Sequence, residues 1–254
     1  MFLRRKKKPQ ATLASHPSYP DFVGALLKAH PRDEAMQLAV GGGFEALGLL
    51  ERALLIQLGL GPNDYLIDVG CGSGRLAKPL SDYLSGQYLG IDVVPELVDY
   101  ARTLVGRPDW RFEVAEGFRI PEQDCRANVV CFFSVFTHLL HEQSYLYLQE
   151  AKRVLKPNGK IIFSFLEFAI PVHWELFQYA IDGAHGSSQP LTMFLSRDAI
   201  HAWAGRLGLK VEHIQDGDVP HIPLSAPVVF SDGEVFEGKG KLGPRGQSVC
   251  VLRA

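Results

Sequence analysis

The feature that most constrains the fold is a short apolar segment that runs directly into closely spaced glycines. Residues 65–69 have the apolar pattern of a buried strand, and Gly70, Gly72 and Gly74 follow before a helical pattern begins near Leu76. Glycine accepts positive φ and lets a ligand approach the backbone closely. In open α/β sheets, ligands bind outside the carboxyl ends of the strands, where the topology reverses. We therefore predict a nucleotide-type site at this turn.

The rest of the chain continues the alternation of strands and helices. Strand patterns recur at 87–91, 111–115, 128–133, 160–166, 209–215 and 247–253. Helical patterns lie at 44–58, 76–84, 95–105, 145–155 and after Ser196, which we expect to cap the last of them. Strands that alternate with helices of this length indicate a parallel sheet with right-handed crossovers. The expected fold class is α/β, a Rossmann-like doubly wound sheet with helical lid elements.

The pattern predicts one main domain with an appended tail. We expect a disordered basic tail at 1–20 and the domain at 21–254, with its core at 44–166. Residues 167–195 form a predicted lid insertion, and residues 216–246 a second insertion with a hairpin at 228–236. Long segments without clear structure are usually functional or mobile. Residues 21–45 and the lid are expected to cover the acceptor site, with Trp174, Phe177, Tyr179 and Phe194 either lining it or packing the lid.

Composition excludes several classes of protein. The chain has 254 residues, 46% hydrophobic and 21% charged, with a net charge of −2, which is typical of a soluble globular protein and gives no support for nucleic-acid binding. The four cysteines are widely separated, which favours reduced thiols in a cytoplasmic protein without a metal site. The basic run at residues 4–8 is either a solvated tail or a weak tether to an anionic membrane surface.

Two acids restrict the ligand. Asp68 lies at the end of the first strand, where a carboxylate would oppose a pyrophosphate but suits a cation. The spacing Gly-x-Gly-x-Gly also differs from the dinucleotide pattern Gly-x-Gly-x-x-Gly. Asp92 ends the second strand, 18 residues after Gly74, and its paired oxygens can accept both ribose hydroxyls. S-adenosylmethionine (SAM), with a sulfonium, an amino group and no phosphate, fits both acids.

Residues 65–168 resemble the class I SAM-dependent methyltransferases of the small soluble group. The resemblance rests on Asp-x-Gly-x-Gly-x-Gly at 68–74, Gly-Ile-Asp at 90–92 and Leu-Lys-Pro-Asn-Gly-Lys at 155–160. It implies a seven-stranded sheet with the last strand antiparallel. It also implies that Asp68 and the turn hold the methionine part, that Asp92 binds the ribose and that Val93 flanks the adenine.

The same resemblance points to the loop after the third strand as an adenine contact. Glu116 is the candidate acid there and Phe118 a candidate stacking ring, although the family's usual Asp is missing. The full set expected to contact SAM is Asp68, Gly70, Cys71, Gly72, Gly74, Asp92, Val93, Glu116, Gly117, Phe118 and Ser134.

Residues 134–139 follow the fourth strand, whose end faces the reactive methyl in this fold. The Asn/Asp-Pro-Pro-Tyr run of base and amino methyltransferases is absent, no acid ends this strand to hold magnesium, and Cys131 reads as a core thiol. His138 is the candidate general base, or else a residue that packs the next helix and lines the pocket. His141, His173 and His185 are weaker alternatives.

The leading interpretation is methylation of a hydroxyl on a small molecule or glycan. The alternatives are a protein or RNA methyltransferase and a non-catalytic SAM-binding partner protein. A nicotinamide oxidoreductase is disfavoured by the glycine spacing and by Asp68. The sequence does not determine the acceptor or the oligomeric state.

Overall fold

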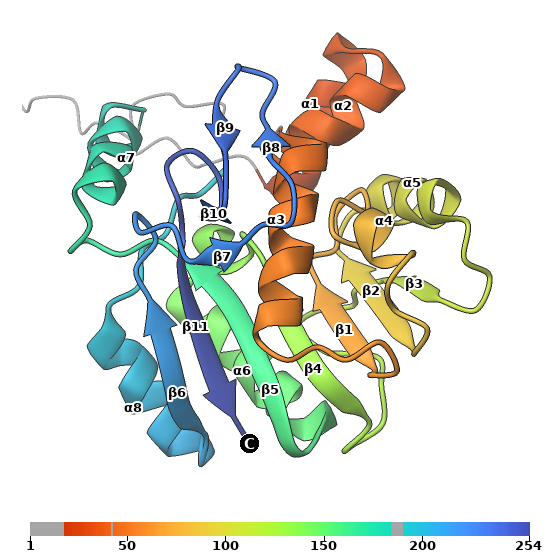
Figure 1. The fold of residues 1–254 in the computed structure, drawn as a ribbon, viewed down its shortest axis with the longest axis vertical. Coiled ribbons are helices and arrows are strands. Elements are labelled where there is room, and N and C mark those ends of the chain that lie inside the picture. Colours follow the sequence, from red (N-terminus) through yellow and green to blue (C-terminus); the bar gives the residue numbers. More distant parts are fainter. Residues whose placement is uncertain (1–17, 42, 184–189) are drawn as a thin grey trace, which may run out of the picture.

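A computed structural model describes residues 18–41, 43–183 and 190–254. Its main sheet has seven strands in the order β3-β2-β1-β4-β5-β11-β6 (Figure 1). Their bounds are β1 Leu66–Val69, β2 Tyr88–Asp92, β3 Arg111–Val114, β4 Ala127–Phe132, β5 Leu155–Phe165, β6 Lys210–Gln215 and β11 Ser248–Arg253. Strand β11 runs antiparallel to β5 and β6, and the pairs among β1 to β5 are parallel. The predicted fold class is confirmed, including the antiparallel last strand.

Helices cover both faces of this sheet. Their bounds are α1 Tyr19–Ala29, α2 Arg32–Ala39, α3 Phe44–Gln57, α4 Ala77–Leu80, α5 Pro95–Val105, α6 His141–Val154, α7 Pro171–Gly183 and α8 Arg197–Leu207, with a short 3₁₀ turn at Phe136–His138. One core cluster joins α3, α4 and α5 to one face, and a second joins α6 and α8 to the other. Successive strand residues point to opposite faces, so Leu66 belongs to the first cluster and Ile67 to the second. All four residues of β1 are buried, as a central parallel strand requires.

Two small antiparallel pairs occupy the second predicted insertion. They are β7 Ile222–Pro223 with β10 Lys239–Gly240, and β8 Val228–Val229 with β9 Val235–Phe236. The second pair is the hairpin that the sequence predicts. Phe230 and Phe236 pack against each other within the first core cluster, which holds this insertion against α3.

Local structure differs from the sequence prediction at four places. The helix expected at 76–84 is the single turn α4, which contains Pro79, a residue without an N–H to donate. Strand β5 begins at Leu155, five residues early, with a register irregularity against β4. Ser196 precedes α8, but its side chain makes no capping hydrogen bond. Of the expected tail, residues 19 and 20 begin α1, and Ser18 caps the helix by accepting a hydrogen bond from the Asp21 N–H; residues 1–17 lie outside the described part.

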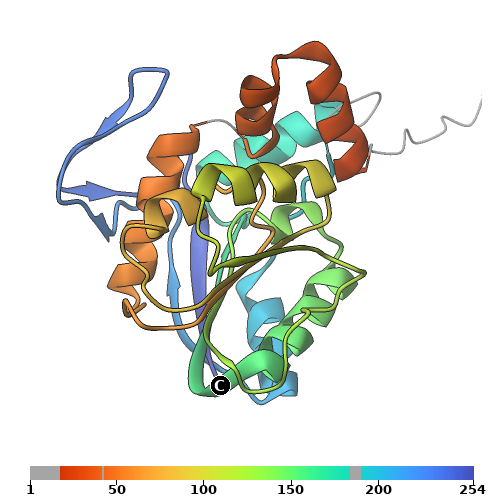
Figure 2. The same ribbon diagram turned by 90° about the vertical axis from the view of Figure 1, so that its right-hand side faces the viewer.

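The carboxyl ends of the parallel strands meet at one end of the molecule, and other segments gather there. Figures 1 and 2 show α1, α2, α7 and the β8–β9 hairpin at this end, with the C-terminus at the opposite one. A third, separate core cluster packs α1 and α2 against the start of α5 through Val23, Met36, Ala39, Val94 and Leu97. In the described part of the chain, no helix combines the length and apolarity that crossing a bilayer would need.

Candidate active site

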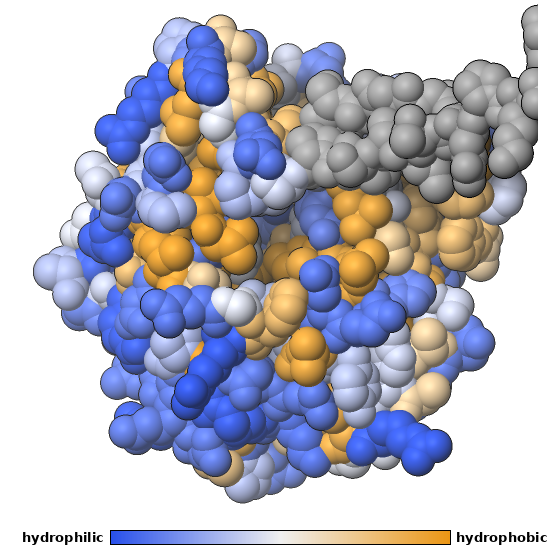
Figure 3. Space-filling view, turned by 180° about the vertical axis from the view of Figure 1, so that it is seen from behind, coloured by the Kyte–Doolittle hydropathy of each residue, from blue (hydrophilic) through white to orange (hydrophobic). Residues whose placement is uncertain are grey.

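A cavity of about 860 Å³ opens at the carboxyl end of the sheet. Its walls come from α1 and α2, the glycine turn, the ends of β2 and β4, the lid segment and residues 242–247. Seen from behind, the molecule is hollowed on this side, with hydrophobic side chains along the hollow (Figure 3). Such a large, mostly apolar cleft with a few polar groups is the usual form of a small-molecule site.

The glycine turn forms the cavity floor with its backbone. Gly70, Gly72 and Gly74 all have positive φ, of 77°, 53° and 92°. A Cβ on Gly72 would lie 2.4 Å from Val40 Cγ1, and one on Gly70 would lie 2.4 Å from Val135 Cγ2. Both positions therefore require glycine for two reasons: the backbone has a positive φ, and there is no room for a Cβ atom. Gly74 differs, because its Cβ would meet Ala101 of α5 rather than the cavity.

Asp92 connects the end of β2 to this turn. Its Oδ2 accepts a hydrogen bond from Gly72 N–H and its Oδ1 one from Val94 N–H, each at 3.0 Å. Burial raises the pKa of Asp92 to about 6, against the lowering effect of these donors. Each carboxylate oxygen keeps a second lone pair for a ligand. Val93 beside it is 44% exposed and lines the cavity, so its side chain is available to pack on a flat ring.

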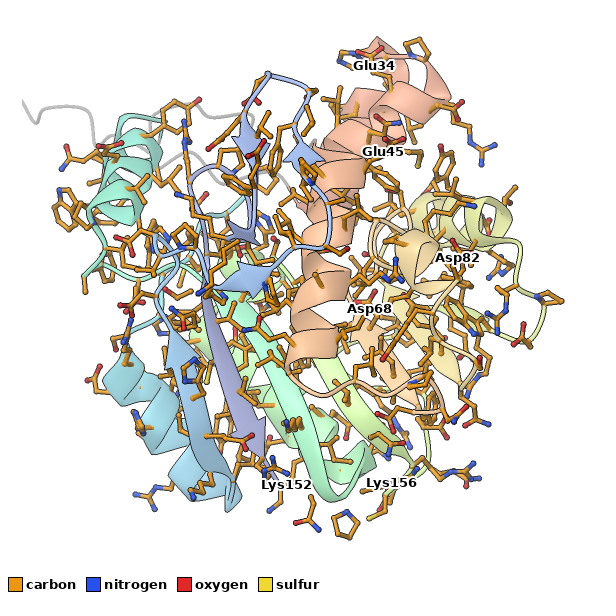
Figure 4. The ribbon with its side chains drawn as sticks, viewed as in Figure 1. Glu34, Glu45, Asp68, Asp82, Lys152 and Lys156 are labelled. Carbon is orange, nitrogen blue, oxygen red and sulfur yellow. The ribbon has the colours of Figure 1, made fainter. Side chains whose placement is uncertain are left out.

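Asp68 lies deeper, at the end of β1 beside α3 (Figure 4). Tyr88 Oη donates to one of its oxygens at 2.7 Å, and Cys131 Sγ lies 3.5 Å from the other. Burial raises the pKa of Asp68 to about 7, more than these hydrogen bonds lower it. A buried carboxylate with such a pKa ionises more readily when a cation binds next to it.

Helix α2 is fastened directly to the glycine turn, and α1 is bonded in turn to α2. Ser73 Oγ donates to the Met36 carbonyl at 2.8 Å, and Arg75 Nη1 donates to the Val40 carbonyl at 2.5 Å. Arg75 is also paired with the buried Glu51 of α3 at 2.5 Å. The Tyr19 ring lines the cavity, and its hydroxyl donates to the Ala39 carbonyl at 2.7 Å. The segment expected to cover the acceptor thus also covers the cofactor turn.

The loop after β3, where the sequence predicts an adenine contact, contributes little to the cavity wall. Glu116 and Gly117 are exposed and do not line the cavity, and Phe118 packs edge-on against Tyr147 in the core. Only Ala115 of this loop reaches the wall. Tyr147 of α6 lines it instead and donates to the Gly117 carbonyl at 3.3 Å. Burial, and then the charge of Asp92, raise the pKa of Tyr147 to about 12.

Ser134 follows the end of β4 in a conformation that a serine rarely adopts, with φ 59°. Its N–H donates to Ser164 Oγ at 2.8 Å, and its carbonyl accepts from Thr137 Oγ1 at 2.9 Å. Its hydroxyl oxygen accepts from Gln247 Nε2 at 2.9 Å. Surrounding hydrogen bonds therefore hold a strained residue at the cavity wall, a pattern that is common at functional sites.

The family model of the methyltransferase domain matches residues 67–163, the stretch from β1 to β5. A ubiquinone biosynthesis O-methyltransferase of Bradyrhizobium diazoefficiens is 29% identical over 123 residues, which cover 47% of this chain and 45% of that protein. The chain spans about half the length of the curated relatives it matches.

Solved structures share the fold over a longer stretch. A putative methyltransferase of Haloferax volcanii, solved with the Trm112 activator, is similar at 21% identity and TM-score 0.64, over 92% of this chain and 98% of that one. A magnesium protoporphyrin IX methyltransferase of Synechocystis with bound SAH is similar at 13% identity and TM-score 0.61, over 92% and 95%. Residues 67–163 thus match a methyltransferase domain, and the chain shares its fold with solved methyltransferases.

SAM is the cofactor of the SAM-dependent methyltransferases that share this fold, and the residues present fit it. The glycine turn leaves no room for side chains, and Asp68 and Asp92 offer buried carboxylates to a ligand with two cationic centres. Seven of the predicted cofactor residues line the cavity: Asp68, Gly70, Cys71, Gly72, Asp92, Val93 and Ser134. Gly74, Glu116, Gly117 and Phe118 do not.

His138 follows Ser134 in the methyltransferase site and lines the cavity. Its Nδ1 lies 2.8 Å from the Leu191 carbonyl, and its ring stacks on Tyr19 at 5.9 Å between centroids. The side chain is exposed, but into a cavity whose surrounding protein desolvates the ring and lowers the pKa of His138, more than its bond to Leu191 raises it. His138 is therefore neutral at pH 7.

The other histidines do not compete for this role. His173 is fully buried, its Nδ1 accepts from the Glu167 N–H at 3.1 Å, and its Nε2 lies 3.1 Å from the Gly246 carbonyl. His141 Nε2 lies 3.1 Å from the Phe194 carbonyl, with the ring edge against Trp203. Neither lines the cavity, and His185 lies outside the described residues.

Several residues of the methyltransferase site escape sequence reasoning. Trp174, Phe177 and Phe194 pack with Phe168 in an aromatic cluster instead of lining the cavity, where the lid contributes Leu176, Pro190 and Thr192. Tyr19, Val40, Tyr147 and the segment 242–247 are further wall residues. In the sequence, only the run Gly243-Pro244-Arg245-Gly246 indicates a feature here, a turn. It does not indicate which part of the molecule that turn approaches.

Proposed function

We propose that the protein transfers the methyl group of SAM to a hydroxyl of a small, largely apolar acceptor. The acceptor space lies beyond the ends of β4 and β5, next to Ser134, His138 and the lid. The similar Bradyrhizobium protein is named as an O-methyltransferase, which supports this acceptor chemistry. The cavity of about 860 Å³ has room for a cofactor and a small acceptor together.

The observation that carries the proposal is the hydrogen bond of His138. A carbonyl oxygen only accepts hydrogen bonds, so the Nδ1 that contacts Leu191 carries the ring proton. In the neutral ring, Nε2 then holds the lone pair, and no described protein group engages it. The burial that lowers the pKa of His138 keeps this tautomer populated at neutral pH. The ring is thus set up to accept a proton.

The residues divide the work of an in-line displacement. SAM supplies an electrophilic methyl with a good leaving group. The glycine turn and Asp92 position the cofactor side, and the lid and Tyr19 enclose the acceptor side. His138 Nε2 takes the hydroxyl proton as the oxygen attacks, and the Leu191 carbonyl stabilises the imidazolium that forms. Alignment supplies roughly 7–11 kcal/mol in such reactions and the base a further factor of about 10²–10⁴.

The test begins with a screen of hydroxylated metabolites and glycans for a SAM-dependent mass gain of one methyl group. With the acceptor in hand, His138→Ala should lower kcat by about 10²–10⁴-fold and leave the SAM Kd unchanged within about two-fold. His141→Ala is the matched control, because His141 lies outside the cavity, and it should keep kcat. Full kcat for His138→Ala on a hydroxyl acceptor would rule out the base.

The pH profile gives an independent check. Because the pKa of His138 is lowered, the wild-type kcat at saturating SAM should stay level as pH falls to about 6.5 and decline only below it. His138→Ala should lose this acidic limb. If the acceptor is instead methylated at a thiolate or a neutral amine, His138→Ala should keep most of the wild-type rate. That result would contradict the proposed hydroxyl acceptor.

A further inference from the structure

Residues 242–247 form a rigid wall of the cavity just before β11. The Gly246 N–H donates to the Gly243 carbonyl at 3.0 Å, which closes a turn with Pro244 and Arg245 at its centre. Gly246 has φ 73°, and a Cβ there would lie 1.8 Å from the Gly217 carbonyl oxygen. The turn therefore packs backbone to backbone against the segment after β6, and its position is fixed.

Two side chains fasten the end of this turn to the rest of the site. His173 Nε2 donates to the Gly246 carbonyl at 3.1 Å, since its Nδ1 accepts from Glu167 N–H. Gln247 donates to Ser134 Oγ at 2.9 Å. Arg245 lies directly before these two anchors, with an exposed side chain that lines the cavity.

The charges around the cavity single out Arg245. Two arginines line it, and Arg75 is already neutralised by Glu51 at 2.5 Å. Among the residues that the structure describes, no carboxylate lies within 4.0 Å of the Arg245 guanidinium. Asp232, the acid on the β8–β9 hairpin that shares this wall, accepts from the Glu234 N–H at 3.1 Å instead. The Arg245 fork thus faces the cavity without a described anionic partner.

Sheet order separates Arg245 from the part of the site that holds the nucleoside. The sequence of strands from Asp92 to the turn is β2-β1-β4-β5-β11, four steps. At about 4.8 Å per step, the ends of β2 and β11 lie on the order of 19 Å apart. Strand β4, which leads to Ser134 and His138, lies between them. Arg245 therefore stands on the acceptor side of the reaction centre.

We propose that Arg245 binds a carboxylate of the methyl acceptor, so that the substrate class is an apolar-bodied acid. This inference rests on the proposed function. A guanidinium binds a carboxylate through two parallel hydrogen bonds, which fixes orientation as well as affinity. The apolar remainder of the acceptor is covered by side chains that reach the same space: Leu139, Leu166, Leu176, Pro190, Leu242 and Pro244.

The test is binding to the full chain saturated with S-adenosylhomocysteine, measured by calorimetry. The probes are 4-phenylbutyrate and its uncharged amide, 4-phenylbutanamide, which have the same apolar body. Wild type should bind the acid about 10–100-fold more tightly than the amide, the size of a charge-assisted pair. Arg245→Gln should bind both equally, Arg245→Lys should keep part of the preference, and Arg206→Gln, an exposed arginine on α8, should behave as wild type.

Each other result counts against a specific statement. Equal affinities in wild type, no binding of the acid, or a preference that survives Arg245→Gln would overturn the inference. If Arg245→Gln weakens S-adenosylhomocysteine itself by a similar factor, the guanidinium serves the carboxylate of the cofactor and not that of the acceptor. Failure of wild type to bind S-adenosylhomocysteine would contradict the proposed function instead.

Discussion

At the scale of single residues, the two buried acids of the cofactor site are costly for the free protein. Asp68 has a folded-state pKa of about 7, against 3.8 for the ordinary side chain. A folded state that binds the proton more tightly than the unfolded state loses stability as pH rises from about 4 to about 7. Asp92, with a pKa of about 6, acts in the same direction. This loss of stability in the free protein is offset when a positively charged ligand binds at the site.

We expect SAM affinity to rise with pH across this window. Below pH 6 both acids are largely protonated in the free protein, and binding a cation must release the protons. The SAM Kd should fall by at most about ten-fold per pH unit per proton released, and level off above pH 7. Calorimetry in buffers of different ionisation enthalpy measures the released protons directly. Asp68→Asn should lose the step near pH 7 and keep the one near pH 6, whereas a SAM Kd independent of pH from 5 to 8 would refute the linkage.

At the scale of elements, the lid helix and the last insertion are joined through one buried histidine. His173 of α7 bridges the Glu167 N–H and the Gly246 carbonyl. Glu167 itself accepts from Arg197 of α8 at 2.7 Å and from the Ser248 hydroxyl of β11 at 2.5 Å. Because the pKa of His173 is lowered by burial, its stabilising effect is present above about pH 6.5 and is lost as pH falls through the folded-state pKa. Protonation would break the bond from Glu167.

His173→Ala should therefore loosen the wall at 242–247 without disturbing the cofactor turn. Two buried backbone groups would lose their partner, at about 1–3 kcal/mol each. We expect a higher acceptor KM, a nearly unchanged SAM Kd and faster amide exchange at 243–247. His173→Gln, which can restore one of the two bonds, is the matched control. Unchanged exchange at this segment in His173→Ala would show that other contacts hold it.

At the scale of the whole molecule, α1 and α2 form a cap with its own small core. Met36 is fully buried in the cluster with Val23, Ala39, Val94 and Leu97, apart from the two large clusters that flank the sheet. The cap reaches the cofactor turn through the Met36 and Val40 carbonyls. A part with few core contacts of its own opens at lower free energy than the sheet.

Met36→Ala should consequently open the cap while the sheet stays folded. Truncation of a buried methionine costs about 2–5 kcal/mol, which is large for so small a cluster. We expect faster amide exchange in 19–39, a SAM Kd raised at least about ten-fold, and little change in the main unfolding transition. Gln37→Ala, on the exposed side of α2, should leave all three unchanged. Faster amide exchange in the cap with an unaltered SAM Kd would show that the cap does not contribute to cofactor binding.

The sequence by itself determined the sheet and the floor of the cofactor site. The periodicity of strands and helices is visible in short stretches of sequence. The same holds for Gly70, Gly72 and the acids at the ends of β1 and β2, because the conformation of a strand followed by a glycine turn depends on neighbouring residues. The predicted strands of the main sheet agree with the observed ones to within five residues, and the antiparallel last strand follows the family resemblance.

Only the tertiary structure decided which distant residues close the cavity. Glu116 follows the right strand but is exposed, whereas Tyr147, from the opposite helix layer, reaches the wall beside Asp92. Leu191, 53 residues away, determines which nitrogen of His138 carries the proton. Contacts of the neighbouring residues with His173, Gly217 and Ser134 hold Arg245 at the cavity wall. These contacts join segments whose approach depends on how the layers pack and not on local pattern, so no periodicity in the chain records them.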